Sequence, residues 1–253
     1  MRHFLWILSF VLLVACKEDS VLPYQELPTA KGTVSLKLEH IWGEESTTFY
    51  TNTWFEHPLS GDSLNFEVLR YYLSGFYFIK AGSGQPDTVK LPLSARLIAV
   101  NGGIFTIDLN DVPAGEYQGM GFYVGLPSAL NQENSTDRDL NPAFGMYRNV
   151  ADGYNFVLAS GISPSANQGR FHLELFGSAG AHPALREVSL SFANEVLKVN
   201  SNSFNELEAR ADISTLWLPT TGNFCHCVLT EPGPETDQVA TQWGASFAFD
   251  HLH

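Results

Sequence analysis

Three histidines are the side chains of this sequence best suited to binding a metal. His251 and His253 are two positions apart, so in an extended chain their imidazole rings point to the same side. His40 falls on the apolar side of an alternating segment, an unusual place for an ionisable ring. Imidazole is a natural ligand for copper and zinc, and two or three converging rings suffice for Cu(II). The alternatives are a hydrogen-bonded imidazole at the core edge for His40, and a frayed chain end for the other two.

A second candidate group consists of His172 and Glu174. Both lie on one face of a predicted strand whose other face carries Phe171, Leu173 and Leu175. The ordinary interpretation is a solvated strand face with a favourable His–Glu pair. The alternative is that both side chains contribute ligands to a metal site.

The triplet Cys225-His226-Cys227 is chemically the most unusual. In an oxidising compartment Cys225 and Cys227 could form a disulfide, although the two-residue spacing closes only a tiny, strained ring that would be easily reduced. Thiolates also suit Cu(I), so a soft-metal site is a second interpretation. Unreacted thiols are the third, and the sequence does not choose among them.

Motifs of catalysis are absent from the sequence. It has no nucleophile elbow, no His-Glu-x-x-His, no phosphate-cradling glycine loop and no dinucleotide fingerprint. Asp137, Asp139 and Asn141 imitate the start of a calcium loop, but Pro142 and Arg148 stand where that loop needs Gly and Glu. We therefore expect a turn there, and a protein that is not an enzyme.

The composition narrows the class of partner and the class of fold. Acidic residues outnumber basic ones 27 to 14, for a formal net charge of -13, which argues against nucleic-acid binding because that needs a basic surface. The chain has 18 Phe, 9 Tyr and 5 Trp beside 21 Gly and 13 Pro. This mixture favours short strands and many turns over long helices.

The N-terminal residues have the features of an export signal. Arg2 precedes an apolar run from Phe4 to Val14, and the run ends in Leu13-Val14-Ala15-Cys16, which resembles a bacterial lipobox. We expect residues 1–15 to be a signal peptide, Cys16 to carry lipid and residues 16–32 to form a tether; the alternative is a signal with an incidental Cys. The residues Lys17-Glu18-Asp19-Ser20 resemble the tags of Bacteroidetes lipoproteins on the outer face of the outer membrane. An outer-membrane lipoprotein is therefore expected, surface-exposed or otherwise on the periplasmic face.

Alternation with a period of two predicts a β protein. The predicted strands cover 33–40, 66–80 (one or two strands), 105–109, 120–124, 154–159, 170–176, 187–192 and 195–199. The turn at 111–115 predicts that the third and fourth of these segments form a hairpin. A helix is predicted over 237–247, capped by Thr236. The expected fold is all-β: one antiparallel β-sandwich over 33–253, with long loops, above all Leu126 to Asn149, and one short C-terminal helix.

Several short motifs in order carry a resemblance to a known family. They are Leu38-Glu39-His40, Tyr71-Tyr72-Leu73-Ser74, Val112-Pro113-Ala114-Gly115-Glu116-Tyr117, Asp139-Leu140-Asn141-Pro142, Gly145-Met146-Tyr147, Gly153-Tyr154 and Phe249-Asp250-His251-Leu252-His253. Together they resemble the MbnP-like family of methanobactin-associated copper-binding proteins, from about Thr33 to His253. The resemblance implies a copper site built from histidines, and it is the resemblance that would bring His40, His251 and His253 together.

The sequence departs from this family at three positions. Arg148 stands where the family usually has Trp, Val150 where a second aromatic residue is common, and Glu174 where a His is typical. Some members carry a Trp oxidised to kynurenine near the copper, and that chemistry is not carried over to this chain.

Two functions are consistent with the sequence. The first is an envelope-anchored lipoprotein that binds copper through histidines for acquisition, storage or handling. The second is a non-metal binding or adhesion module for glycan or protein on the same sandwich, because exposed rings at Trp42, Trp54, Tyr147 and Tyr154 could stack on a ligand. An envelope protein partner is compatible with both.

Overall fold

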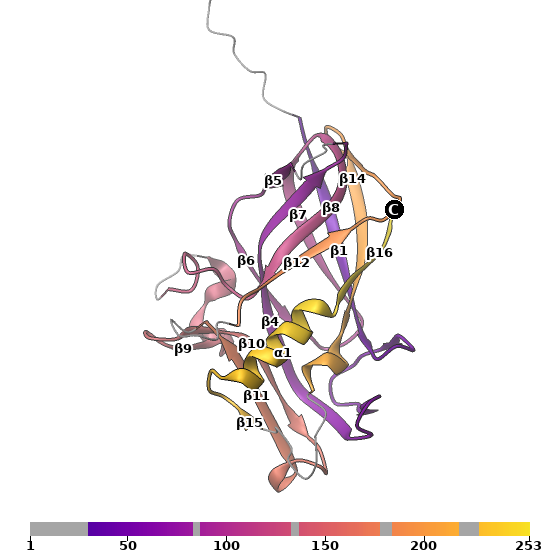
Figure 1. Ribbon diagram of the computed structural model, residues 1–253. Coiled ribbons are helices and arrows are strands. Elements are labelled where there is room, and N and C mark those ends of the chain that lie inside the picture. The colour runs from indigo at the N-terminus through magenta and orange to yellow at the C-terminus, as the bar shows by residue number, and fades with distance from the viewer. Residues whose placement is uncertain (1–29, 83–86, 133–136, 178–183, 218–227) are drawn as a thin grey trace, which may run out of the picture.

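A computed structural model describes residues 30–82, 87–132, 137–177, 184–217 and 228–253 (Figure 1). The predicted signal peptide, Cys16 and nearly all of the predicted tether lie outside these residues. So do Cys225, His226 and Cys227.

Two sheets form the body of the molecule (Figure 1). The five-stranded sheet contains β1 (Lys31–Trp42), β2 (Thr47–Thr48), β7 (Ile104–Pro113), β14 (Phe204–Asp212) and β16 (Phe247–Leu252). The other sheet contains β3 (Trp54–Glu56), β4 (Ser63–Lys80), β5 (Thr88–Lys90), β6 (Ala95–Ala99), β8 (Gly115–Val124), β9 (Tyr147–Asn149), β10 (Gly153–Ile162), β11 (Arg170–Phe176), β12 (Arg186–Ser191), β13 (Leu197–Val199) and β15 (Val228–Leu229). The predicted all-β sandwich with one C-terminal helix is confirmed.

Alternating residues explain why these segments become strands with one buried face. In β1, Val34, Leu36 and Leu38 are fully buried, while Lys37 and Glu39, at the alternate positions, reach the other face. The segment predicted as one or two strands is the single 18-residue β4, which pairs with β10 along its first half and with β8 along its second. β4 therefore joins the two ends of the large sheet.

Aromatic rings fill the space between the sheets and under the helix. Phe49 and Phe66, from the two sides of the core, have ring centroids 5.5 Å apart in an edge-to-face arrangement. The helix α1 (Pro234–Ala245) buries Trp243 completely, with its ring 5.3 Å from that of Tyr71 in β4. α1 is thus held by the core of the sandwich, and Figure 1 shows it lying across the strands.

The helix begins earlier than predicted and ends before Phe247. Pro234 is its first residue, and Gly233 is the N-cap. Thr236, the predicted cap, lies inside the first turn, where its hydroxyl oxygen accepts the Gly233 N–H at 2.8 Å. Phe247 is the first residue of β16, so the four-residue spacing of Val239, Trp243 and Phe247 continues two residues beyond the last helical residue, Ala245.

The predicted hairpin at residues 111–115 is wrong. β7 pairs with β1 in the five-stranded sheet, whereas β8 pairs with β4, β12 and β13 in the other. The turn therefore carries the chain from one layer to the next, and the Tyr117 hydroxyl fixes it by donating to the Pro113 carbonyl at 2.7 Å. Alternation marks both strands as half-buried, but it does not reveal which strand is the partner.

Two strand pairs, β1 with β14 and β11 with β15, are parallel and not antiparallel as expected.

The long loop after β8 is tied to the sheet. It contains two 3-10 turns, η1 (Arg138–Leu140) and η2 (Pro142–Phe144), and two others, η3 (Asn167–Gly169) and η4 (Ile213–Leu216), lie elsewhere. Asp137 accepts the Ala95 N–H at 2.8 Å, and Asp139 accepts the Leu97 N–H at 3.1 Å. These carboxylates, which imitate a calcium loop in sequence, hold the loop against the edge of β6.

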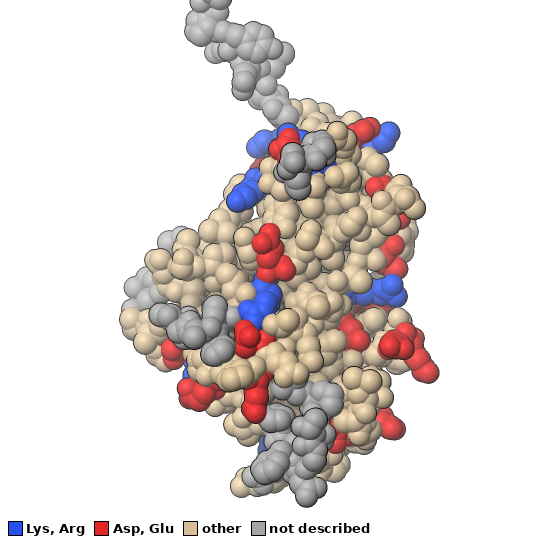
Figure 2. Space-filling model, viewed as in Figure 1, with Lys and Arg blue, Asp and Glu red and all other residues tan. Residues whose placement is uncertain are grey.

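Charged side chains are spread over the surface without a broad basic patch on the face that Figure 2 shows. Within the described residues, no helix has the length and apolar character needed to cross a membrane.

Replacing Asp139 by Ala is expected to lower the free energy of unfolding by about 1–3 kcal/mol, because the Leu97 N–H loses its acceptor. Asp87→Ala is the matched control, since Asp87 forms an exposed ion pair with Lys80 that should contribute no more than about 1 kcal/mol. Urea unfolding measures both. Equal losses in the two variants would contradict the proposed role of Asp139.

Candidate metal centre

A bulge in β16 sets the direction of the last histidines. β16 runs antiparallel to β14, with Phe249 opposite Ala209 and both on the inner face. The register then shifts at Asp250, so that His251 lies opposite Glu208. Without this extra residue the period of two would turn His251 and His253 toward the core. The bulge places both rings on the outer face of the five-stranded sheet.

Glu208, His251 and His253 form the metal-ligand group found in the described part of the chain, with one potential ligand atom from each residue within 4.8 Å of the others. His253 Nε2 is 3.1 Å from Glu208 Oε1, and His251 Nε2 is 3.5 Å from Glu208 Oε2. The two imidazole rings meet edge to face, with centroids 4.3 Å apart. All three side chains are partly exposed, at 42% for His251, 49% for His253 and 26% for Glu208, so an ion could reach them from solvent.

Neighbouring charges surround this group on the same face. Lys37 Nζ lies 2.6 Å from Glu206 Oε2 and 3.8 Å from Glu208 Oε1. Asp250 lies between Arg210, whose guanidinium is 3.4 Å away, and His251, whose Nδ1 is 3.5 Å away. Three carboxylates thus stand against two cations, which leaves a negative balance of charge around the two imidazoles.

The donor set suits a borderline transition-metal ion. Two imidazole nitrogens and a carboxylate oxygen are ligands that Cu(II) and Zn(II) accept, and the Asp250 carboxylate beside His251 Nδ1 is placed to orient that ring. Glu208 was not among the residues singled out from the sequence. Its signal is the alternation of Glu206, Glu208 and Arg210 with the buried Leu207 and Ala209.

The structure does not bring His40 to His251 and His253. His40 is 1% exposed and points into the core, where Nδ1 is 3.2 Å from the Gly103 carbonyl and Nε2 is 2.8 Å from the Tyr71 hydroxyl. A carbonyl only accepts, so Nδ1 carries the hydrogen and Nε2 accepts from Tyr71. Burial lowers the pKa of His40 to about 4, so the ring is neutral at physiological pH. His40 occupies the hydrogen-bonded core position that was its alternative interpretation.

His172 and Glu174 lie together, but Arg148 occupies the space beside them. The Arg148 guanidinium forms an ion pair with Glu174 and stacks on Phe176, with Cζ 3.8 Å from the ring centroid. His172 Nε2 is 2.9 Å from the other Glu174 oxygen. The pKa of His172 is lowered mainly by desolvation and, to a smaller extent, by the positive charge of Arg148. Two of the departures from the family pattern, Arg148 and Glu174, are therefore in direct contact. A metal cation does not fit there, because Arg148 already supplies the positive charge.

The aromatic side chains proposed for ligand stacking are mostly inside the protein. Trp42 and Tyr154 are buried at 6% and 1% exposure, and Tyr147 packs against the core. Trp54 alone of the four is an exposed large ring. The expected stacking surface is therefore not formed.

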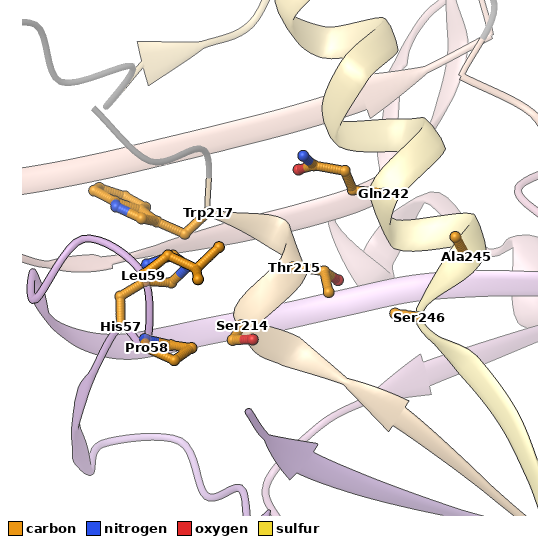
Figure 3. A pocket seen from close by; sticks show the side chains of 9 residues that line it. All are labelled: His57, Pro58, Leu59, Ser214, Thr215, Trp217, Gln242, Ala245 and Ser246. Carbon is orange, nitrogen blue, oxygen red and sulfur yellow. The ribbon is translucent and has the colours of Figure 1, made fainter. Parts of the chain in front are cut away.

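A pocket of about 300 Å³ lies between the turn after β3, η4 with Trp217, and the end of α1 (Figure 3). Its walls are mainly apolar, and His57 is the one titratable side chain that lines it. His57 Nδ1 accepts the Ser60 N–H at 3.1 Å, and the ring is also hydrogen-bonded to the Ser214 backbone. Burial lowers the pKa of His57. Because these bonds occupy the ring, His57 serves to fasten the turn to η4.

Comparison with known proteins adds a family and a structural likeness. A family model described as MbnP matches residues 31–227. The matched range contains Glu208, and His251 and His253 come after it. Among solved structures, MbnP from Methylosinus trichosporium is similar, with 14% sequence identity, coverage of 74% of this chain and 77% of that chain, and a TM-score of 0.49. No curated protein matches the chain.

Acid is expected to destabilise the fold through His40. The pKa of about 4 lies below the ordinary 6.5, so between these values the unfolded chain binds a proton that the folded chain does not. The free energy of unfolding therefore falls as the pH decreases through this window, by about 3 kcal/mol. Chemical denaturation at several pH values should show a shallower fall for His40→Gln than for the unmodified chain. Parallel profiles would show that His40 is not the group responsible.

Proposed function

The chain belongs to the MbnP family, which is associated with copper, and from this premise we propose that it binds Cu(II) through His251, His253 and Glu208. The observation that carries the proposal is the convergence of two imidazoles and one carboxylate on the outer face of the β14–β16 pair. The family supports copper in general, and the geometry supports these three ligands.

The distances agree with ligation after small side-chain movements. Two ligand atoms bound to one ion at about 2.0–2.2 Å can be no more than about 4 Å apart. The Glu208–imidazole distances, 3.1 Å through Oε1 and 3.5 Å through Oε2, already satisfy this limit, and the group with one ligand atom from each residue spans 4.8 Å at most. Because the three side chains are partly exposed, they can rotate toward a shared ion without any movement of the close-packed core.

Copper is the metal that this donor set favours. An N and O site binds divalent first-row ions in an order that peaks at Cu(II) and falls again at Zn(II). Three protein ligands leave at least one coordination position to water or to another molecule. An exposed, incompletely filled coordination sphere fits a protein that takes up and hands on its metal, and the proposed role is copper acquisition or handling without catalysis.

The double variant His251→Ala/His253→Ala is expected to lose Cu(II) binding by more than about 100-fold, since even the removal of groups that only orient a metal ligand costs about 10–100-fold. Glu208→Gln should weaken binding by a smaller factor. Competition against a chelator of known affinity measures both. Cys225 and Cys227 should be changed to Ser in every sample, so that thiols do not compete for copper.

His172→Ala is the matched control for this experiment, because His172 is also exposed on a strand beside a glutamate but stands against Arg148. It should bind Cu(II) as the parent chain does. Retention of copper by the double variant, or an equal loss in His172→Ala, would overturn the assignment to His251 and His253.

We further propose that the chain is an outer-membrane lipoprotein anchored through Cys16, on the basis of the apolar run and the lipobox-like residues that precede it. Cells grown with radiolabelled palmitate should incorporate label into the parent chain and none into Cys16→Ser. Equal labelling of the two would contradict the anchor. Copper binding by the soluble domain does not depend on this result.

A further inference from the structure

Lys37 lies directly beside the proposed copper ligands. The parallel register of β1 and β14 sets Lys37 opposite Glu208, and both side chains point to the outer face. The Lys37 ammonium is 3.8 Å from Glu208 Oε1, and the same oxygen is 3.1 Å from His253 Nε2. One carboxylate oxygen thus stands between a fixed positive charge and an imidazole that would bind the metal.

We propose that Lys37 is a built-in electrostatic regulator of this site, which holds its affinity for divalent cations down by repulsion. The inference rests on the proposed function, because it concerns the same three ligands. Glu206 is the positioning residue, since its carboxylate receives a 2.6 Å hydrogen bond from Lys37 and holds the ammonium 3.8 Å from Glu208, short of direct pairing with it.

The size of the effect follows from the distances. An ion bound to Glu208 at about 2.1 Å lies no more than about 6 Å from an ammonium that is 3.8 Å from the same oxygen. At that separation, and with the permittivity of water, the repulsion between a divalent ion and one positive charge corresponds to about a tenfold loss of affinity. The side chains of Lys37, Glu206 and Glu208 are about 30% exposed or less, so the effective permittivity around them is lower than that of water. The loss of affinity is therefore at least about tenfold before salt screens the repulsion.

The other cation of the site does not have this effect to the same degree. The Arg210 guanidinium is paired with Asp250, which is itself next to His251 Nδ1, so an intervening carboxylate shields the ring from it. Lys37 has no such carboxylate between it and the metal position except Glu208, which is one of the ligands. Lys37 is therefore the charge whose removal should change binding most.

Such repulsion weakens all divalent ions by about the same factor. The order of affinities is unchanged. The affinity for the more weakly binding ions, however, becomes too low for them to occupy the site at their available concentrations. Cu(II), at the top of that order, remains bound. Lys37 would in this way allow an exposed acidic site to stay free of more abundant, weaker-binding cations.

The test compares Cu(II) and Zn(II) affinities of the parent chain with those of Lys37→Met, Lys37→Arg and Glu206→Gln, by chelator competition at low salt. Lys37→Met keeps the apolar stem and should tighten both metals about tenfold or more, whereas Lys37→Arg keeps the charge and should bind like the parent. Glu206→Gln should weaken binding, because Lys37 then pairs with Glu208 alone. At high salt the differences should shrink. Lys198→Met is the matched control, since Lys198 pairs with Glu116 elsewhere on the surface.

The outcomes separate this inference from the proposed function. If Cu(II) binding depends on His251 and His253 but is the same in the parent, Lys37→Met and Lys198→Met, the regulatory role is overturned and the copper site stands. An equal gain in Lys37→Met and Lys37→Arg would also overturn it, because a structural effect would then explain the change. If neither the parent nor Lys37→Met binds Cu(II), both proposals fail together.

Discussion

Residues Thr33 to Ile41 pair in parallel register with Phe204 to Asp212, and most of the candidate site depends on this contact. The pairing buries Leu36, Leu38 and Ala209 on one side of the sheet. On the other side it sets Lys37 against Glu206 and Glu208, which are about 170 positions further along the chain. β16 then adds to the free edge of β14, as Figure 1 shows, and brings its two histidines to Glu208.

Burial gives similar residues very different roles in this protein. The His40 ring is enclosed and bonded at both nitrogens, so it acts as a neutral hydrogen-bonding link between β1, β4 and the Gly103 turn. His251 and His253 remain in contact with solvent and keep nitrogens that an ion could approach. Glu174 and Glu208 are similarly exposed, at 20% and 26%, and differ instead in their charged partners. Arg148 neutralises the first fully, whereas Lys37 shares its charge between Glu208 and Glu206.

The opposing charges around Glu208 give the site an intermediate character. A cluster of carboxylates alone would attract many cations, and a guanidinium paired directly with a carboxylate would exclude them, as Arg148 does beside Glu174. One flexible ammonium, paired mainly with Glu206, lies between these two extremes. This arrangement is the basis of our proposal that the site admits a strongly binding ion and disfavours weaker ones.

The sequence by itself determined the fold class, most of the strands and the helix around Trp243, because the periods of two and 3.6 are local properties of the chain. The predicted strand at 170–176 coincides with β11. β14 is not predicted from the sequence, because two of the residues on its buried face are the small Ala209 and Ala211. Strand partners, the crossing between sheets at residue 114 and the place of His40 were decided only by tertiary structure. The bulge at Asp250 is the sharpest case: the side of the sheet on which His251 and His253 emerge is set by pairing with β14, which spacing along the chain does not encode.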